Sequence, residues 1–562
     1  MRRLILIFAA LIAIAVVSTA LAILVSSGGG GGSFRLAWRI AGPIPDYDAG
    51  TTFLLPGQER PESVASVYSA LTKARTDDRV RGLSVFIQQA SFGLAKATQF
   101  RRLLEAVSER GKPVDCYLET AGEGGNGTLA YFLASACDSI SLAPAGEINL
   151  LGLYVDRMFL RGSLDKLKVD AEFFRVGEYK SAVETYTEYE NSPAAEEAVA
   201  AVLDDFYASI LDAISEARGV PSEELLAIVD SAPHSADEAL SFGLVDHLEY
   251  PDEFRARTEG GPELLWLTDY EAGPHADSQS VAVVFAQGTI VRGRSGYDAW
   301  TQEPILGAES FSALLSELRD DASVAAVVLR IDSPGGSALA SDLILREVEL
   351  LSGVKPVVVS MSDVAASGGY YIAAKADVIV AEATSLTGSI GVFGGKLVTR
   401  RFQEEMLGIS HDTLKRGANA DLYSSVEQLT AEQAAEVQGL MQVVYDRFVD
   451  HVATGRDMEF EVVNAVARGR VWTGVRALDL GLVDEIGGIE RAVEIARTAA
   501  GLEPDDTAAL EFYPRPASWL DLFSGGPGFS VARDLAPYLE LLSGNQQRLR
   551  LPPDLAALRQ PF

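Results

Sequence analysis

A serine within a run of small residues is the first candidate for chemistry in this sequence. Ser367 lies in the segment Ala365-Ala366-Ser367-Gly368-Gly369, shortly after the apolar, strand-like run Val357 to Val359. Because its neighbours carry little or no side chain, a substrate backbone could come close to a hydroxyl group at this position. Ser367 is therefore a candidate nucleophile for acyl transfer, a reaction that also requires a general base.

A glycine turn earlier in the sequence is a candidate for the stabilisation of an oxyanion. The segment Ile331-Asp332-Ser333-Pro334-Gly335-Gly336 follows another strand-like run. Such turns can direct backbone N–H groups at a developing negative charge. Gly335, Gly336 and Gly368 are thus candidate oxyanion donors, although glycine turns after strands are also common as purely structural features.

Histidine and cysteine supply neither an obvious base nor a metal centre. The five histidines are far apart in the sequence and none lies in a glycine-rich motif: His234, His247, His275, His411 and His451. A Ser-His-Asp triad and a zinc site therefore have little support. The two cysteines, Cys116 and Cys137, are too few to staple a chain of this size, and we expect them to be free, buried apolar residues.

These groups belong to a domain that occurs twice, with a period of about 240 residues. Gly243-Leu244-Val245-Asp246 recurs 238 residues later as Gly481-Leu482-Val483-Asp484. A helical apolar stripe recurs with the same offset and predicts one buried helix face in each copy. Its members are Val199, Val202, Leu203, Phe206 and Ile210 in the first copy, and Val437, Leu440, Met441, Val444 and Phe448 in the second. Ser192-Pro193 and the capping box Thr430 to Gln433 predict the starts of the two helices.

Each copy alternates strands and helices. The strand-length apolar runs Leu83 to Ile87 and Val327 to Ile331 are each preceded by a helical segment and followed by a glycine-containing turn, which indicates a largely parallel α/β fold. We expect a first repeat over residues 34–251, a linker over 252–279 and a second repeat over 280–501. Residues 502–562 show no counterpart in the first copy, and no role is assigned to them.

The N-terminus has the pattern of a membrane anchor. Met1-Arg2-Arg3 precedes an uncharged, mostly apolar run from Leu4 to Val25, and about 20 such residues span a bilayer core. A cleavable signal peptide is the alternative, but its apolar region usually spans only about 7–15 residues. We therefore expect an uncleaved, single-pass anchor over residues 1–26 and a Gly/Ser tether over 27–33. The two arginines predict a cytoplasmic N-terminus, with the catalytic body on the periplasmic or extracytoplasmic side of the inner membrane.

Composition narrows the choice of partners. The formal net charge of −32 argues against nucleic acid and against broad binding to anionic lipid, because both require a basic surface. A chain of 562 residues is also too long for one hydrophobic core, and two or three domains are expected.

Two further motifs occur in the second copy, Thr387-Gly388-Ser389-Ile390-Gly391 and Gly469 to Gly474. Their occurrence together with the two glycine turns is a specific combination of motifs. With them, the sequence resembles the long, two-repeat form of the signal peptide peptidase A family, within the Clp-protease/crotonase superfamily. The resemblance covers nearly the whole chain between anchor and tail. It implies two tandem Clp-protease/crotonase-like domains and a membrane-bound homotetramer. It also implies a serine endopeptidase without cofactor or metal that degrades cleaved signal peptides and other peptides.

The resemblance also assigns the base. Gly177-Glu178-Tyr179-Lys180-Ser181 is similar to the family's lysine motif, which makes Lys180 the expected general base and Ser389 the residue expected to hydrogen-bond its amine. The amine must be neutral to act as a base, so burial has to lower its pKa by several units from about 10.4. The structural alternatives are a solvated surface lysine beside Glu178 and a turn-capping serine at position 389.

The repeat offset indicates that the two copies have lost complementary groups. Lys180 aligns with Ala420 and Ser367 with Thr128, the second match being less secure because the glycine turn of the first copy is longer. Neither half should be active alone, and one site per chain should form where the repeats meet. Two other functions stay open: a crotonase-like acyl-CoA enzyme, which an export anchor disfavours, and a catalytically silent membrane scaffold.

Overall fold

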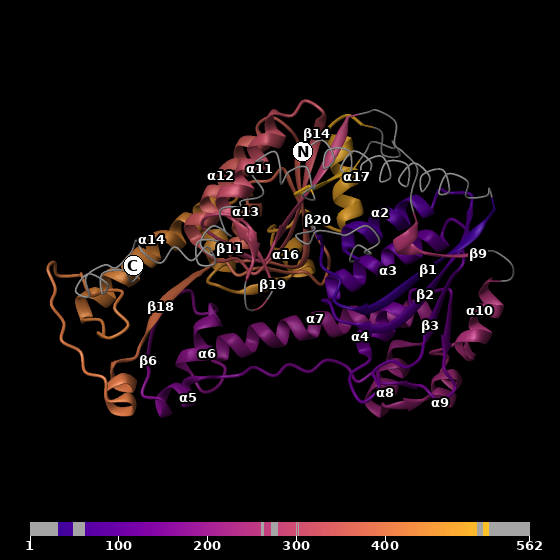
Figure 1. The fold of residues 1–562 in the computed structure, drawn as a ribbon, viewed down its shortest axis with the longest axis horizontal. Helices are drawn as coiled ribbons and strands as arrows, with labels where there is room; N and C mark the ends of the chain where they lie inside the picture. Colours follow the sequence, from indigo (N-terminus) through magenta and orange to yellow (C-terminus); the bar gives the residue numbers. More distant parts are fainter. Residues whose placement is uncertain are drawn as a thin grey trace, which may run out of the picture.

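The computed structural model describes residues 32–48, 62–259, 263–270, 279–298, 301, 303–502 and 510–515. The expected anchor and most of the tether therefore lie outside the described residues. Among the helices that are described, none combines the length and the apolar character needed to cross a membrane. In Figure 1 the first repeat, in indigo and purple, lies beside the second repeat, in pink and orange.

The first repeat is built on a parallel sheet with the strand order β8-β4-β3-β2-β1-β9. Its strands are β1 (Phe34–Gly42), β2 (Val80–Ala90), β3 (Val114–Leu118), β4 (Ser139–Leu142), β8 (His247–Leu248) and β9 (Glu263–Trp266). The helices around it are α2 (Val64–Ala74), α3 (Leu94–Ser108), α4 (Thr128–Ala134), α8 (Ser222–Ser231), α9 (Ala236–Ser241) and α10 (Pro251–Glu259), and β5 (Glu147–Ile148) pairs with β7 (His234–Ser235). Every residue of β3 is buried, as is typical of parallel sheets that are covered on both faces.

The second repeat has an equivalent sheet with the order β19-β17-β15-β14-β10-β21, extended by β16 and β20. Its strands are β10 (Ser280–Gln287), β14 (Val324–Ser333), β15 (Val357–Ala366), β16 (Val378–Ala381), β17 (Leu386–Gly388), β19 (Val471–Thr473), β20 (Glu485–Ile486) and β21 (Leu510–Tyr513). A small separate sheet contains β11 (Thr289–Val291), β12 (Gly296–Tyr297) and β13 (Pro304–Gly307). The helices are α11 (Ala308–Asp320), α12 (Ala338–Ser352), α13 (Gly368–Ala373), α15 (Phe460–Val466), α16 (Gly474–Asp479) and α17 (Ile489–Ala499). The predicted α/β class, with two largely parallel sheets, is confirmed.

Each main sheet ends in an edge strand that the sequence analysis did not predict. β9 lies in the expected linker and pairs parallel with β1. β21 follows residue 502 and pairs parallel with β10 in the same way. The expectation that the segment after residue 502 has no counterpart in the first copy is therefore wrong. Both strands have only four residues, too few for a strand pattern to stand out against the polar, Gly- and Pro-containing sequence around them.

The two predicted apolar stripes form long helices, α7 (Pro193–Arg218) and α14 (Ala431–Gly455). Ser192 caps α7, and the capping box between Thr430 and Gln433 is confirmed at the start of α14. The prediction of a buried face along all of α14 is wrong, because Leu440 is 60% exposed whereas Phe448 is 4% exposed. The C-terminal half of α14 contributes to the core of the second repeat, and its N-terminal half extends outward, as Figure 1 shows.

A two-stranded antiparallel sheet joins the two repeats. In it, β6 (Asp170–Val176) of the first repeat pairs with β18 (Val392–Val398) of the second. Figure 1 shows β6 and β18 running together away from the main sheets, toward the side where α5 (Arg161–Lys166), α6 (Glu184–Thr187) and the start of α14 lie. The pairing register fixes the segment that follows β6 against the second repeat.

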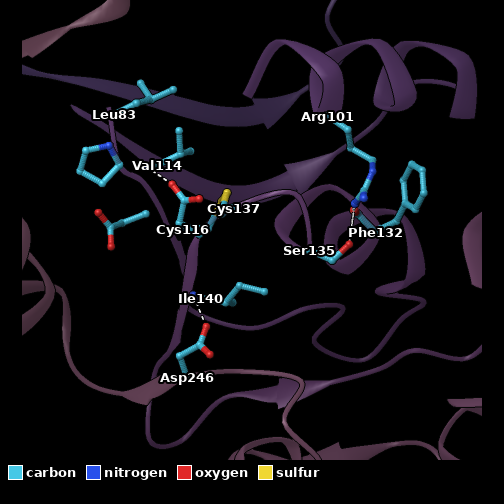
Figure 2. The surroundings of a disulfide bond; sticks show 12 residues. Leu83, Arg101, Val114, Cys116, Phe132, Ser135, Cys137, Ile140 and Asp246 are labelled. Atoms are coloured by element: carbon cyan, nitrogen blue, oxygen red, sulfur yellow. Dashed lines mark hydrogen bonds between the residues drawn. A yellow bond between two sulfur atoms is a disulfide. The ribbon is translucent and has the colours of Figure 1, made fainter. Parts of the chain in front are cut away.

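Cys116, in β3, and Cys137, just after α4, form a disulfide within the first repeat, as Figure 2 shows. The expectation of free cysteines is therefore wrong. β3 pairs with β4, which begins two residues after Cys137, and this brings the two Cα atoms to 5.8 Å. The contact depends on the order of strands in the sheet, which two cysteines separated by 21 residues do not reveal.

Candidate active site

Ser367 occupies the sharp turn between β15 and α13. Its backbone has φ 55° and ψ −117°, a combination that costs a residue other than glycine about 1–3 kcal/mol. The Ser367 N–H donates to the Gly388 carbonyl at 2.9 Å, so pairing with the neighbouring segment helps to hold the strained turn. The geometry presents the serine side chain at the end of the strand, where it lines a cavity.

Lys180, from the first repeat, lies next to this serine of the second repeat. Its Nζ atom is 3.0 Å from Ser367 Oγ, 2.9 Å from Ser389 Oγ and 2.8 Å from the Ser389 carbonyl oxygen. Ser389 also has a positive φ, 51°, and this conformation lets both of its oxygens face the amine. Ser367 and Ser389, which follow Lys180 by 187 and 209 positions in the sequence, thus both meet its amine.

The amine of Lys180 lies in a buried environment that contains no carboxylate partner. The residue is only 4% exposed, and burial lowers its pKa to about 7. Glu178, the nearest acidic residue in sequence, instead pairs with Arg468 at 2.7 Å. The alternative of a solvated lysine beside Glu178 therefore does not hold. At neutral pH a substantial fraction of this amine is unprotonated.

Two glycines let the loop from Gly177 to Ser181, here called the lysine loop, pack closely against the second repeat. Gly469 has φ +82°, and a Cβ atom there would lie 2.5–2.7 Å from Lys180 backbone and Cβ atoms. Gly177 has φ +98°, and a Cβ atom there would lie 2.2 Å from the Arg468 carbonyl oxygen. The Tyr179 N–H donates to that same carbonyl at 3.0 Å. Neither glycine was predicted to have a role, although Gly177 lies in the motif that contains Lys180 and Gly469 begins the segment Gly469 to Gly474.

The glycine turn of the second repeat faces the start of α13. A Cβ atom on Gly335 would lie 2.4 Å from the Gly368 nitrogen, so glycine is needed for the two turns to touch. Gly368 opens α13, and the first N–H groups of a helix have no acceptor within it. The Gly335 N–H donates to Ser333 Oγ at 3.1 Å, which leaves Gly336 as the better candidate donor in this turn.

These groups line a cavity of about 540 Å³ between the repeats. One part of its wall is apolar and consists of Tyr371, Val392, Phe393, Val444 and Phe448. Among the described residues, no group of His, Cys, Asp and Glu side chains could hold a metal ion. The nearby imidazole of His451 is hydrogen-bonded to Asp342 and does not contact Ser367.

The corresponding places in the other copy lack this arrangement. Thr128 begins α4, and its hydroxyl donates to the Gly152 carbonyl at 3.2 Å and accepts from the Gly152 N–H at 3.1 Å. Ala420 lies in an exposed turn. The contact between Lys180 and Ser367 therefore combines the base candidate of one repeat with the nucleophile candidate of the other.

Comparison with known proteins places this geometry in a family. The model of peptidase family S49 matches residues 106–264 and residues 349–503, one segment in each repeat and more than half of the chain together. The chain belongs to peptidase family S49. This S49 chain is 32% identical over 509 residues to the chloroplastic serine protease SPPA of Arabidopsis thaliana, covering 87% of this chain and 74% of the relative. It is 32% identical over 486 residues to Protease 4 of Salmonella typhi, covering 82% of this chain and 75% of the relative.

Other similarities cover less of the S49 chain. A relative from Enterococcus faecium, provisionally named signal peptide peptidase SppA, is 36% identical over 205 residues, which are 36% of this chain and 59% of the relative. A ClpP1 mutant from Listeria monocytogenes aligns with a TM-score of 0.24 and 16% identity over 37% of this chain and 91% of that one, a likeness that carries no argument. The family match identifies the chain as a serine protease, so the acyl-CoA enzyme and the silent scaffold are set aside.

Proposed function

We propose that this S49 protease is an endopeptidase with a Ser367/Lys180 dyad. The observation that carries the proposal is the 3.0 Å contact between Lys180 Nζ and Ser367 Oγ, in a site where burial lowers the pKa of the amine to about 7. The neutral amine takes the proton of the Ser367 hydroxyl as Oγ attacks the substrate carbonyl carbon. The ammonium then returns that proton to the leaving amine, which departs and leaves an acyl-enzyme ester.

Hydrolysis of the ester repeats these steps with water. Lys180 accepts a proton from water as the water oxygen attacks the ester, and it returns the proton to Ser367 Oγ when the peptide acid leaves. The N–H groups of Gly368 and Gly336 bind the oxyanion in both halves of the reaction. Ser389 orients the amine through its hydroxyl and carbonyl oxygens, at 2.9 and 2.8 Å from Lys180 Nζ.

The proposed substrates are peptides with an apolar segment, among them the remnants of cleaved signal peptides. The apolar wall of the cavity, which includes Phe393 and Phe448, suits an apolar substrate side chain. The relative from Enterococcus faecium provisionally named as a signal peptide peptidase is consistent with this class.

The proposed location is the inner membrane, with both repeats outside the cytoplasm. The apolar run from Leu4 to Val25 behind two arginines supports a single-pass anchor with its N-terminus inside. The disulfide between Cys116 and Cys137 agrees with an oxidising compartment.

We further propose a homotetramer. Two apolar surfaces of the single chain are exposed: one near residues 151–158, where Tyr154 is 85% exposed and Met158 is 71% exposed, and one near residues 406–440, where Leu414 is 89% exposed and Tyr423 is 82% exposed. Exposed apolar surface of this kind is typical of interaction sites. Because the two surfaces differ, contact between them on successive chains would be head-to-tail, an arrangement that can close into a ring.

Covalent labelling tests the dyad directly. A fluorophosphonate probe should phosphonylate Ser367, and peptide mapping should find the label on the peptide that contains this residue. Ser367→Ala should lose both label and peptidase activity. The control is Ser341→Ala, because Ser341 lines the same cavity but its hydroxyl donates to the Ser337 carbonyl at 3.0 Å. Label on Ser341, or full activity in folded Ser367→Ala protein, contradicts the proposal.

A further inference from the structure

A second buried lysine of the first repeat, Lys96, forms ion pairs with the second repeat. Lys96, in the first turn of α3, has a side chain that is only 8% exposed. Its Nζ atom lies 2.7 Å from an Asp332 oxygen, 3.0 Å from an Asp46 oxygen and 3.5 Å from an Asp363 oxygen. Asp332 and Asp363 belong to the second repeat, so one ammonium group of the first repeat binds two carboxylates of the other.

The two second-repeat carboxylates lie at the bases of the two catalytic turns. Asp332 is near the end of β14 and precedes the turn that contains Gly335 and Gly336. Asp363 lies near the end of β15, four residues before Ser367. The Asp332 carboxylate also accepts from the Val364 N–H at 3.2 Å, which links the two strand ends directly.

Asp363 holds the start of α3 as well. Its carboxylate accepts from the N–H groups of Gly93 at 2.9 Å and Lys96 at 3.0 Å. The N-cap residue of α3 is Gly93, which has no side chain to cap the helix, and a Cβ atom there would lie 2.2–2.6 Å from the Asp363 carboxyl group. A residue of the second repeat thus caps a helix of the first, which fixes the position of Lys96.

The third carboxylate connects this cluster to a buried arginine beneath the same strands. Asp46 is fully buried and accepts from Arg330 Nε at 2.8 Å. Arg330 in turn donates to Ser360 Oγ at 2.9 Å and to Ser362 Oγ at 3.0 Å, both on β15. Lys96 and Arg330 are therefore the two cations of a buried group that contains three carboxylates.

Charge balance makes Lys96 important to this arrangement. Burial would lower the pKa of Lys96, but the surrounding carboxylates, Asp46 foremost, raise it above its ordinary value, so the group stays charged. Burial and the Asp46 carboxylate raise the pKa of Asp332 to about 7, whereas Lys96 acts in the opposite direction. Without the ammonium group, Asp332 would take up a proton or move away from Asp46, and the turn that follows it would shift.

We propose that Lys96 is a positioning residue for catalysis, which aligns the oxyanion turn and the nucleophile turn through Asp332 and Asp363. Nothing in this role requires contact with the substrate. A shift of about 1 Å in a reacting group can cost about 100-fold in rate. The inference rests on the proposed dyad, because it concerns the alignment of Gly336 and Gly368 with Ser367.

Lys96→Met tests this role, with Arg102→Met as the matched control. Arg102 lies on the same helix, and its Nη1 atom is 3.0 Å from Glu382 and 3.3 Å from Glu490 of the second repeat. Both substitutions remove an ion pair between the repeats, but only Lys96 contacts the bases of the catalytic turns. We expect kcat of Lys96→Met to fall about 10-fold to 100-fold with KM within about threefold. We expect kcat of Arg102→Met to stay within about twofold per folded molecule, because Arg102 pairs with Glu382 and Glu490 rather than with Asp332 or Asp363.

A peptide aldehyde separates alignment from general loosening. The aldehyde adds to Ser367 Oγ and forms an oxyanion, so its inhibition constant should rise in Lys96→Met by a factor similar to the loss in kcat/KM, while KM for substrate changes little. The thermal midpoint of each variant gives the folded fraction, and all rates are expressed per folded molecule.

Asp332→Asn keeps the shape of the side chain, and it tests the same role if Lys96→Met does not fold. We expect it to lower kcat about threefold to tenfold, and the double variant to lose no more than the worse single variant, because both changes act on one contact. Wild-type kcat in folded Lys96→Met, or in Asp332→Asn if the former does not fold, overturns the inference. An equal loss in Arg102→Met, or additive losses in the double variant, also overturns it. Activity in Ser367→Ala is the separate result that would instead overturn the dyad.

Discussion

At the scale of the residue, the proposed chemistry involves two lysines in opposite environments. The hydrogen-bond partners of Lys180 Nζ are oxygens of Ser367 and Ser389, and burial lowers the pKa of this amine. Lys96, which is nearly as buried, is surrounded by three carboxylates that raise its pKa. The difference in partners, rather than in burial, makes one amine a candidate base and the other a fixed positive charge.

The pH profile should report the Lys180 amine. Because its pKa in the folded protein is lowered to about 7, kcat/KM should rise as the pH increases through about 7 and level off above it. Lys180→Arg should be inactive at every pH, since a guanidinium group does not deprotonate in proteins. The measurement is kcat/KM for a peptide substrate across this pH range. A profile with no change near neutrality would remove the lysine from the mechanism.

The same lowered pKa predicts a cost in stability. The folded pKa is about 7 and the ordinary value is 10.5, so between these values the unfolded chain binds the proton that the folded protein has released, and the penalty is largest at and below neutral pH. Lys180→Met should therefore stabilise the protein at neutral pH by roughly 1–3 kcal/mol. The thermal midpoints of variant and wild type should converge as the pH approaches the ordinary lysine value. A variant less stable than wild type at neutral pH would contradict this account.

Ser389→Ala tests whether that hydroxyl orients the base. The change removes a hydrogen bond of 2.9 Å to Lys180 Nζ, and we expect kcat to fall about 10-fold to 100-fold with little change in KM, equivalent to roughly 1.4–2.7 kcal/mol in the barrier. Ser389→Gly is the control for the backbone, because glycine accepts the positive φ of 51° without strain. If the hydroxyl matters, both variants lose the same activity. A lower melting temperature with unchanged turnover would identify a turn-capping serine instead.

Some of the site residues could be predicted from the sequence and others could not. Ser367 and Gly368 were marked by their small neighbours, and Lys180 and Ser389 by motif resemblance. Lys96 and Asp332 form no motif with one another, because their contact arises from the packing of α3 against the ends of β14 and β15. The disulfide between Cys116 and Cys137 was missed for the same reason.

At the scale of the element, the lysine loop is held between the β6–β18 pair and the segment 468–470. β6 ends one residue before Gly177, and its pairing with β18 is what brings this loop across to the second repeat.

Helix starts and long strands could be predicted from capping residues and apolar runs, as at Thr430 and over Val357 to Val359. The edge strand β21 and the exposed half of α14 could not, because pairing and burial there depend on neighbours outside the local sequence.

Gly469→Ala should disturb the lysine loop. A Cβ atom there would lie 2.5–2.7 Å from Lys180 atoms, and φ is +82°. The matched control is Gly481→Ala, which has a similar φ of +72° but would meet only Met458 Sδ at 3.8 Å. Both variants should lose similar backbone stability, about 1 kcal/mol, but only Gly469→Ala should lose turnover, by about tenfold or more. Equal turnover in the two variants would show that close packing at 469 does not position the base.

At the scale of the whole molecule, the candidate site combines residues of both repeats. The sequence period predicted this arrangement, because Ala420 and Thr128 stand where each repeat would need its lysine or serine. The sequence repeat could not predict how the two main sheets are placed relative to each other. That placement depends on contacts between the repeats, such as Lys96 with Asp332 and Arg102 with Glu382.

Mixing of inactive variants tests whether each chain carries its own complete site. Ser367→Ala and Lys180→Ala chains, produced together in one cell, should stay inactive in any oligomer they form, because the 3.0 Å contact joins two residues of the same chain. The activity of the purified mixed assembly is compared with that of wild type at equal concentration. Recovery of activity well above either variant alone would mean that the base acts on the serine of a neighbouring chain.

The distance in sequence between the two residues of the proposed dyad also determines how much later the second is synthesised than the first. Lys180 precedes Ser367 by 187 residues, and a ribosome that adds about 5–20 residues per second needs roughly 10–40 s to make that interval. During this time a nascent chain already contains the proposed base but not the proposed nucleophile, and Ser389 and Gly469 are synthesised later still. Under the proposed dyad, a chain gains activity only after its second repeat has been synthesised and has folded onto the first.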